Sequence, residues 1–185
     1  MPQVSFRALR IFEEEDGFHR RIVTRKREEL PEGDVLVRVH YSALNYKDAL
    51  SATGNKGVSR NYPHTPGIDA AGKVVESRDP AFAEGDRVIV TSYDLGMNTD
   101  GGFAEYMTLH ASGLFKLPEA MSFEDGALVE PLAVSYRAVK QAGAVYPDRL
   151  AVIGGGTIGL LALAVAKAIG VRETFIAVKY PQQAK

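Results

Sequence analysis

The stretch Val152-Ile153-Gly154-Gly155-Gly156-Thr157-Ile158-Gly159-Leu160 decides how the C-terminal part of this chain folds. It has the spacing GxGxxG and lies between the short apolar segment 150–153 and the long, alanine-rich apolar segment 160–169. This order predicts a β-strand, a glycine turn and a helix N-terminus, whose free backbone N–H groups and positive dipole end bind a pyrophosphate. The flanking segments carry the prediction, because GxGxxG alone occurs in many unrelated proteins.

The residues of this turn have distinct expected roles in binding a dinucleotide. Gly154 allows the tight turn, Gly156 lets the backbone approach the phosphates, and Gly159 lets the helix pack close to its strand. The predicted cofactor-binding residues also include three neighbours in the turn and the helix start: Gly155, Thr157 and Ile158. The alternative is a purely structural glycine turn.

The segment after the turn extends the pattern to a strand–helix–strand unit. Residues 160–169 are strong helix formers, Gly170 is placed to end the helix, and Thr174 to Val178 reads as a second buried strand. Lys179 lies 20 positions after Gly159, where an acidic residue usually hydrogen-bonds the ribose 2′-hydroxyl of NAD. A lysine there attracts a 2′-phosphate instead, which favours NADP. The alternative is an exposed strand-end lysine without any contact.

The composition excludes several classes of function. A hydrophobic content of 45%, a charged content of 24% and a net charge of −1 are typical of a soluble globular protein and indicate neither a nucleic-acid nor a membrane partner. The absence of cysteine excludes disulfides and thiolate metal sites. The N-terminus lacks the apolar core of a signal peptide, and no apolar run is long enough to span a bilayer. We therefore expect a cytoplasmic protein that acts on a small molecule.

The first 115 or so residues are predicted to be all-β. Turn signals at 13–17 and 31–34 separate segments rich in β-branched and aromatic residues, and repeated short strands of this kind favour a Greek-key barrel or sandwich. Residues 45–50 are expected to form a short helix, followed by an irregular excursion over 51–66. The predicted strands are Val4 to Phe12, Phe18 to Thr24, Val35 to Ala43, Gly67 to Val75, Arg87 to Thr91 and Phe103 to Leu109.

The pattern changes near Pro118. Ser122 is a suitable N-cap for a helix over 123–129, Pro131 fits the first turn of a second helix, and Ala142-Gly143 closes that helix. We therefore predict three parts: a domain over residues 1–121, connecting helices over 122–147, and a strand–helix–strand unit over 148–185.

Motifs along the chain resemble those of the medium-chain dehydrogenase/reductase superfamily. Besides the fingerprint at 154–159, they are Leu44-Asn-Tyr-Lys-Asp48, Pro66-Gly-Ile-Asp-Ala-Ala-Gly72, Gly85-Asp-Arg-Val88 and Gly101-Gly-Phe-Ala-Glu-Tyr106. The resemblance implies an α/β chain with a GroES-like β-barrel domain followed by a partial Rossmann dinucleotide-binding unit. Residues 1 to about 120 are similar to zinc-independent quinone oxidoreductases, acrylyl-CoA reductases above all. Residues from about 126 to 180, including Ala127-Leu-Val-Glu-Pro-Leu-Ala133, are similar to zinc-type polyol and threonine dehydrogenases.

The resemblance to the zinc branch does not extend to its metal ligands. The family's cysteine ligand falls on Asn45 and its Gly-His-Glu on Gly67-Ile68-Asp69, so that Asp69 and Glu130 are too few to hold a catalytic zinc. The segment 91–101 also lacks the four-cysteine lobe of structural zinc. None of the four histidines has metal-ligand or triad spacing; they are His19, His40, His64 and His110. We therefore expect no zinc.

Without a metal, conjugate reduction fits better than alcohol oxidation. Hydride passes from NADPH to the β-carbon of an activated alkene, or to a quinone, and a proton is added next to the carbonyl. By resemblance, the catalytic residues are Asn45, which hydrogen-bonds the substrate carbonyl or a bound water, Tyr46, which walls the pocket or donates a proton, and Asp48, which fixes the loop. The alternative is that Asn45 and Asp48 only satisfy backbone groups at a helix start.

The predicted dinucleotide unit has two strands, whereas a complete one has about six. We therefore expect a truncated reductase of reduced activity, or one completed by another copy as a homo-oligomer or by another chain. Two further functions remain as alternatives. One is a non-catalytic β-barrel interaction module whose strand–helix–strand unit mediates assembly, and the other is a zinc-type polyol or alcohol dehydrogenase.

Overall fold

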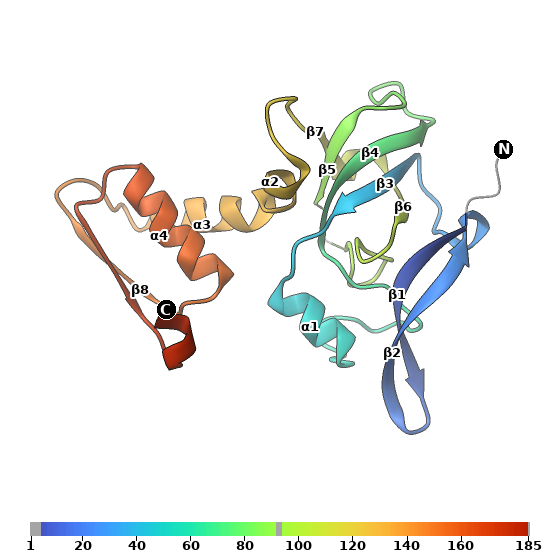
Figure 1. Ribbon diagram of the computed structural model, residues 1–185, viewed down its shortest axis with the longest axis horizontal. Coiled ribbons are helices and arrows are strands. Elements are labelled where there is room, and N and C mark those ends of the chain that lie inside the picture. The colour runs from blue at the N-terminus through green and yellow to red at the C-terminus, as the bar shows by residue number, and fades with distance from the viewer. Residues whose placement is uncertain (1–4, 92–93, 185) are drawn as a thin grey trace. The chain divides into compact units, whose positions relative to one another are not determined.

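The computed structural model describes residues 5–91 and 94–184. The chain divides into two compact units, Met1–Ala127 and Leu128–Lys185. The first unit is built mainly from antiparallel strands, and in the second unit helices pack on one side of a parallel strand pair (Figure 1). Among the described residues, no helix has both the length and the apolar character needed to cross a membrane.

The N-terminal unit contains a two-stranded ribbon and a five-stranded sheet. The ribbon consists of β1 (Ser5–Glu14) and β2 (Gly17–Lys26), which pair antiparallel along their whole length. The sheet has the order β6-β3-β4-β5-β7, and all of its neighbours are antiparallel. Its strands are β3 (Val35–Tyr41), β4 (Asp69–Ser77), β5 (Arg87–Thr91), β6 (Tyr106–Leu109) and β7 (Leu114–Lys116).

Short helices connect these strands. Helix α1 (Tyr46–Ala52) follows β3, and helix α2 (Phe123–Ala127) follows β7. Ser122 caps α2 as predicted, because the backbone N–H of Asp125 donates to its Oγ at 3.0 Å. Two 3₁₀ turns complete the unit, η1 (Arg27–Glu29) and η2 (Ala111–Gly113).

The core of this unit lies on one face of the sheet. Alternate residues of β5 are buried, so Val88 and Val90 point inward while their neighbours are partly exposed. Strands β3, β4 and β6 add side chains to the same layer. The buried cluster consists of Val35, Val37, Ala70, Val74, Val88, Val90, Leu95, Met107, Leu109 and Leu114.

A buried ion network joins the ribbon to the rest of the unit. The carboxylate of Asp100 accepts hydrogen bonds from Arg10 at 2.5 Å and Arg25 at 2.6 Å, and a third from the backbone N–H of Thr65 at 3.0 Å. The Asp100 side chain is 14% exposed and that of Arg25 is 8% exposed. Backbone bridges between Ile11 and His64 add to this attachment.

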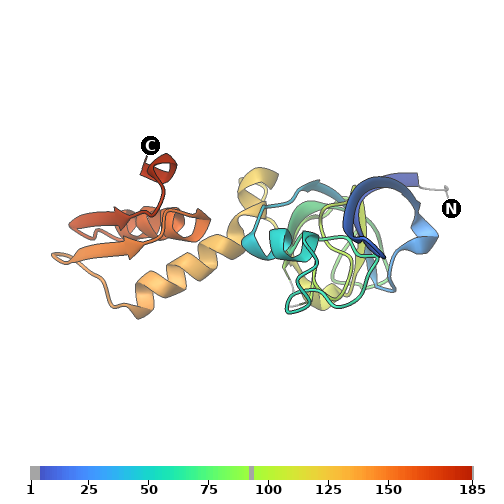
Figure 2. The same cartoon turned by 90° about the horizontal axis from the view of Figure 1, so that it is seen from below.

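The C-terminal unit contains the predicted strand–helix–strand arrangement. Strand β8 (Arg149–Ile153) pairs in parallel with β9 (Glu173–Ala177), and α4 (Thr157–Ala168) crosses between them. Figures 1 and 2 show α4 lying along the two strands. Helix α3 (Val129–Gln141) packs against α4, and a 3₁₀ turn η3 (Pro181–Ala184) follows β9. Gly170 follows α4 with φ +88°, the left-handed conformation expected at this position.

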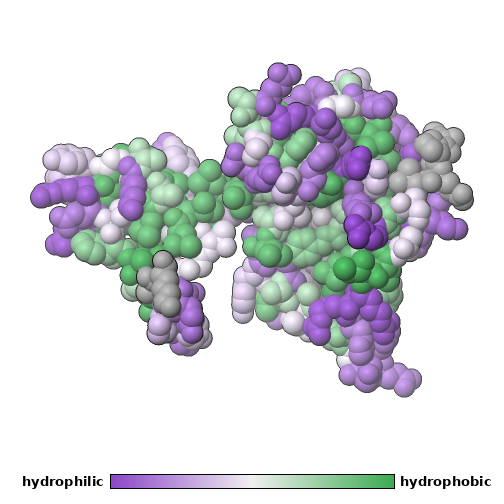
Figure 3. Space-filling view, viewed as in Figure 1, coloured by the Kyte–Doolittle hydropathy of each residue, from purple (hydrophilic) through white to green (hydrophobic). Residues whose placement is uncertain are grey.

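The core of the C-terminal unit is small and covers one side of the strand pair. Leu150 and Val152 pack against it, whereas Ile153 is 91% exposed and Phe175 is 47% exposed. Hydrophobic side chains gather on the surface of this unit over α4 (Figure 3). The buried cluster consists of Val139, Ala144, Ala162, Val165, Ala166 and Val171.

Candidate nucleotide and substrate sites

The glycine turn joins β8 directly to α4. Gly154 has φ +111°, a conformation that side-chain-bearing residues rarely adopt, and its N–H donates to the carbonyl of Ala177 at 2.8 Å. Gly156 is the N-cap of α4, and no side chain caps the helix there. The first N–H groups of α4 therefore lack an intrahelical acceptor, which is the arrangement that binds anions at helix N-termini.

The glycines of this turn differ in how much space surrounds them. A Cβ on Gly159 would lie 1.9 Å from the carbonyl oxygen of Gly154, so only glycine lets α4 approach the turn this closely. A Cβ on Gly155 would lie 2.6 Å from the side chain of Val178. A Cβ on Gly156, in contrast, would meet nothing within 4 Å. The space beside Gly156 is open, which is compatible with the close approach of a diphosphate.

The other predicted cofactor-binding residues surround this turn. Thr157 begins α4 and is exposed, and Ile158 is 42% exposed in the same helical turn. Lys179 lies two residues beyond the end of β9, exposed, with Nζ 5.3 Å from the ring centroid of Tyr180. The turn η3 comes close to Gly155 through Gln183, whose Cβ would lie 3.3 Å from an added methyl.

Ser135 supports the first turn of α4, a role that was not predicted from the sequence. Its hydroxyl lies 2.8 Å from the carbonyl of Pro131 and 3.1 Å from that of Ile158, so it connects α3 to the first turn of α4. The residue is fully buried. One sequence feature indicated this role. Ser135 lies four residues before Val139, on the apolar face of the predicted helix, where a polar residue needs a hydrogen-bond partner.

A second group of predicted residues lies where α1 begins. Asp48 is 3% exposed, and its carboxylate accepts from the backbone N–H of Asn45 at 2.8 Å and from those of Gly67 and Ile68, both at 3.1 Å. Burial raises the pKa of the Asp48 carboxyl, and the hydrogen bonds from these backbone groups oppose that rise. Asp48 thereby holds the start of α1 against the residues that precede β4.

The side chain of Asn45 contacts a second buried carboxylate. Its Nδ2 donates to Asp69 Oδ2 at 2.8 Å, and Asp69 is 2% exposed. The residues on either side of Asn45 are open to solvent, since Leu44 is 78% exposed and Tyr46 is 80% exposed. The structure thus brings Asn45 and Asp48 together with Asp69, while the Tyr46 side chain extends away from this cluster into solvent.

The donor set at this position does not match a catalytic zinc centre. Of the three positions that correspond to the family's zinc ligands, Ile68 offers no donor atom, and the amide of Asn45 is hydrogen-bonded to the carboxylate of Asp69. Catalytic zinc takes three protein ligands from histidine, cysteine or carboxylate side chains.

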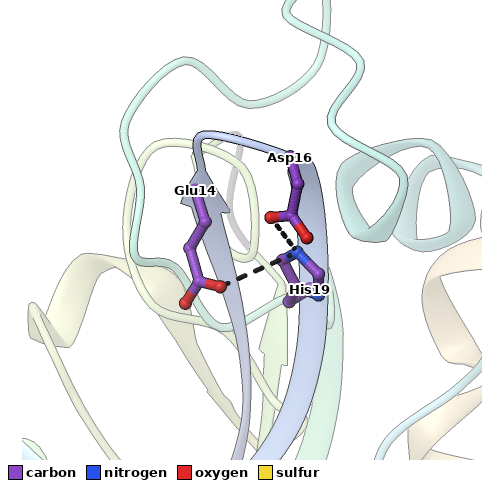
Figure 4. A group of neighbouring side chains, drawn as sticks. All are labelled: Glu14, Asp16 and His19. Atoms are coloured by element: carbon purple, nitrogen blue, oxygen red, sulfur yellow. Dashed lines mark hydrogen bonds and ion pairs between the residues drawn. The ribbon is translucent and has the colours of Figure 1, made fainter.

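One group of side chains among residues 5–91 and 94–184 has the spacing of metal ligands, and it lies in the turn of the ribbon (Figure 4). Its members are Glu14, Asp16 and His19. His19 Nε2 is 2.7 Å from Asp16 and 3.7 Å from Glu14. Arg21 binds both oxygens of Glu14, at 2.6 and 2.9 Å, and lowers the pKa of that carboxyl. An exposed ion network at a hairpin turn accounts for this cluster.

Comparison with known proteins assigns the N-terminal unit. Residues 31–119 match the family described as the alcohol dehydrogenase GroES-like domain. The chain is 38% identical over 165 residues to the putative quinone oxidoreductase YhfP of Bacillus subtilis, a match that covers 87% of this chain and 50% of the relative. It is also 38% identical over 141 residues to the probable acrylyl-CoA reductase AcuI of Escherichia coli, covering 74% of this chain and 44% of the relative.

A third relative is a dehydrogenase by name. The (R,R)-butanediol dehydrogenase of Bacillus subtilis is 35% identical over 141 residues, covering 65% of this chain and 41% of the relative. All three matches extend beyond the GroES-like domain in length.

Two solved structures are similar to this chain in fold. The yhdH oxidoreductase of Salmonella enterica in complex with NADP superimposes with a TM-score of 0.79 at 29% identity, covering 92% of this chain and 60% of that one. The Bacillus subtilis protein yhfP with NAD bound superimposes with a TM-score of 0.80 at 32% identity, covering 94% and 60%.

The fold combines a GroES-like domain with a strand–helix–strand unit that contains a glycine turn. The chain belongs to the medium-chain dehydrogenase/reductase superfamily, as its sequence motifs indicated. It spans about half the length of the curated relatives that it matches.

Proposed function

We propose that this protein is an NADP-dependent, zinc-independent oxidoreductase, or part of one, that transfers hydride from NADPH to an activated alkene or a quinone in the manner of an acrylyl-CoA reductase. One observation carries the proposal: the open space at Gly156 lies directly before the uncapped N-terminus of α4. The quinone oxidoreductase and acrylyl-CoA reductase names of the relatives support the reaction class, and the NADP-bound neighbour supports the cofactor.

The residues of the C-terminal unit would bind and orient the cofactor. The backbone N–H groups of residues 156–159 would donate to the diphosphate, with Ser135 holding the first helical turn in place. Lys179 would attract the 2′-phosphate because its exposed ammonium group follows the second strand. NADPH, when bound, supplies the hydride. We assign this role to residues 148–185 and treat 122–147 as the connection to the substrate domain, residues 1–121.

The residues at the start of α1 would serve the substrate. The amide of Asn45 would donate a hydrogen bond to the substrate carbonyl or to a bound water, and the exposed hydroxyl of Tyr46 would donate a proton. Asp48 would keep α1 in register with the residues before β4 through its three backbone hydrogen bonds. Together these groups would orient the alkene and stabilise the charge that develops on its carbonyl oxygen.

Paired glycine variants test the nucleotide site. Gly156→Ala adds a methyl group to open space, so the melting temperature stays native, while NADPH binding weakens by about 1–3 kcal/mol because the methyl occupies space that the diphosphate would take. Gly159→Ala forces its methyl against the Gly154 carbonyl and lowers both binding and thermal stability. Gly57→Ala is the control for an added methyl, since it meets only the end of the Asn55 side chain. The measurement is an NADPH titration followed by protein fluorescence.

Native affinity for NADPH in Gly156→Ala, or no NADPH binding by the native chain, would contradict the proposal. In the second case the alternative of a non-catalytic β-barrel interaction module takes its place. A zinc-type polyol or alcohol dehydrogenase would instead show stoichiometric zinc by elemental analysis, which the donor set at Asn45 argues against.

The choice between NADP and NAD depends on Lys179. We expect Lys179→Asp to weaken NADPH binding by about fivefold to tenfold and to strengthen NADH binding, because a carboxylate repels the 2′-phosphate and accepts from the ribose hydroxyl. Lys167→Asp, a charge reversal on α4 away from the strand end, is the matched control. An unchanged ratio of the two affinities would discard the 2′-phosphate assignment.

We also propose that the C-terminal unit associates with further polypeptide, as a homo-oligomer or with another chain, and that the protein acts in the cytoplasm on a small molecule without nucleic-acid or membrane partners. The exposed face of β8 and β9 supports association, because parallel strands are normally covered on both faces. The mass of the protein in solution tests this part of the proposal.

A further inference from the structure

Two buried carboxylates connect the start of α1 with the start of β4, and each of the two elements contributes one of them. Asp48, on α1, accepts from the backbone N–H groups of Gly67 and Ile68, both at 3.1 Å. Asp69, on β4, accepts from Asn45 Nδ2 at 2.8 Å. We call these five residues the carboxylate clamp. Asp48 fixes the backbone at the start of α1, and Asp69 fixes the Asn45 side chain. Both contacts are made with residues 67–69.

Asp69 decides which way the Asn45 amide is turned. Asp69 Oδ2 accepts the hydrogen bond from Asn45 Nδ2, so Nδ2 faces the carboxylate and the amide oxygen faces elsewhere. The terminal torsion of asparagine has two similar minima, so an amide without such a neighbour adopts either orientation. Asp69 is itself held in place, since the hydroxyl of Ser42 donates to its backbone carbonyl at 2.5 Å and only 2% of the residue is exposed.

We propose that Asp69 is a positioning residue for the reduction, and that it acts by fixing the Asn45 amide so that the second N–H of Nδ2 is available to the carbonyl oxygen of the acceptor. This proposal rests on the proposed function, in which Asn45 contacts the substrate. As hydride adds to the β-carbon, the π electrons of the alkene shift towards the carbonyl oxygen, and a proton added at the α-carbon completes the reduction. A fixed N–H donor stabilises the negative charge on that oxygen without reorganising during the reaction.

The clamp also explains why the acceptor would carry a carbonyl group. The orientation set by Asp69 offers an N–H donor from Nδ2, whereas the flipped amide would offer an oxygen that repels a carbonyl. Substrates with a hydrogen-bond-accepting oxygen conjugated to the alkene, namely enones, enoyl thioesters and quinones, fit this donor. Simple alkenes lack the accepting oxygen.

Asp69→Asn tests the proposal, because it keeps the shape of the side chain but allows either amide orientation at Asn45. With NADPH and but-3-en-2-one as the probe substrate, we expect kcat to fall by about 10- to 100-fold, the size of effect that follows loss of reactant positioning. The KM for the enone and the dissociation constant of NADPH should stay near native. Asp69→Glu keeps an acceptor-only carboxylate and should restore part of kcat.

Asp34→Asn is the matched control, since Asp34 forms an exposed ion pair with His110 at 3.2 Å, away from the clamp. The kcat and KM of Asp34→Asn should equal those of the native protein. An Asp69→Asn enzyme with native kcat, or one in which only KM rises, would overturn the proposal. The same holds if Asp69→Glu and Asp69→Asn lose equal activity while their melting temperatures match that of the native protein.

A measurement without substrate separates this inference from the proposed function. The side-chain amide signals of Asn45, identified in nitrogen-15 NMR spectra by their loss in Asn45→Ala, should show one hydrogen protected from exchange with water. Asp69→Asn should remove that protection and Asp34→Asn should not. Unchanged protection in Asp69→Asn overturns the positioning role. If the signals change as expected but the native chain reduces no alkene, the proposed function fails and the orientation of Asn45 by Asp69 stands.

Discussion

The two units of this protein use similar apolar residues in different ways. In the N-terminal unit, valines on successive antiparallel strands are buried completely, and Val35, Val37 and Val88 have no exposed surface. In the C-terminal unit the strands are just as apolar, yet Ile153 is 91% exposed and Phe175 is 47% exposed. The difference shows that one unit covers its core with its own chain, whereas the other buries one face of its sheet and leaves the opposite face open.

The helical layer of the C-terminal unit adds a second open surface. A groove of about 540 Å³ runs between α3 and α4, lined by the side chains of Leu132, Tyr136, Val165 and Ile169 among others. Its walls are almost entirely apolar, and Tyr136 is 46% exposed. We therefore expect the same substitution, made at a buried position of each unit, to lower the free energy of unfolding more in the N-terminal unit.

The largest effect is expected for Asp100→Ala in the N-terminal unit. The change leaves the guanidinium groups of Arg10 and Arg25 buried without their shared carboxylate, and breaking a buried ion pair on one side costs about 3–5 kcal/mol. Urea denaturation measures the loss. Asp34→Ala, which breaks an exposed pair with His110, should cost about 0–1 kcal/mol. Equal losses in the two variants would show that the buried network does not hold the ribbon in place.

Matched valine truncations compare the two cores directly. Val88→Ala removes two methyl groups from a fully buried site and should reduce the free energy of unfolding by about 1.5–3 kcal/mol. Val165→Ala lies beside the open groove, where neighbours and water can fill the space, so its cost should be smaller. Hydrogen exchange of the two units in each variant measures the effects separately. A larger loss for Val165→Ala would reverse the comparison.

The smallest effect on stability is expected for Ile153→Lys on the open sheet face. Because this side chain is 91% exposed, its replacement should change the free energy of unfolding by about 0.5 kcal/mol or less. The same change should reduce association of the protein, if the open face is where further polypeptide binds. Sedimentation velocity at several protein concentrations measures association, and Ile22→Lys, at a 74% exposed position of the N-terminal ribbon, is the control.

Much of the fold was predictable because strand and turn signals are local. The strand Arg87–Thr91 was predicted at its observed bounds, and the helix after the glycine turn was predicted from its alanine-rich composition. The strand expected from Gly67 begins instead at Asp69, because the N–H groups of Gly67 and Ile68 donate to Asp48 rather than to a neighbouring strand. This exchange of partners involves residues far apart in sequence, so local patterns do not reveal it.

One other strand boundary differs for the same kind of reason, and one short strand was not predicted. The strand predicted from Phe103 begins at Tyr106, since the N–H groups of Phe103 and Glu105 donate to Pro66 and Arg7. The three-residue strand β7 was missed because so short a segment has no detectable alternation.

The candidate sites also differ in whether their residues are adjacent or far apart in the sequence. The glycine turn is a contiguous motif, and it was predicted from its spacing together with the apolar segments on either side. The hydrogen bond between Asn45 and Asp69 joins residues 24 positions apart, and that between Ser135 and Ile158 joins residues 23 positions apart. Such contacts depend on how strands and helices pack, so the sequence indicated which residues matter but not how they are connected.

The attachment of the β1–β2 ribbon bears on the order in which the chain acquires its structure during synthesis. Its anchors are His64, Asp100 and Ala104, all of which leave the ribosome long after Lys26 has been made. Contacts between such distant positions form slowly because a large loop must close first. The ribbon is thus secured only after much of the following sheet has been made, and a nascent chain stopped before residue 100 would have His64 as an anchor for the ribbon but would lack Asp100 and Ala104.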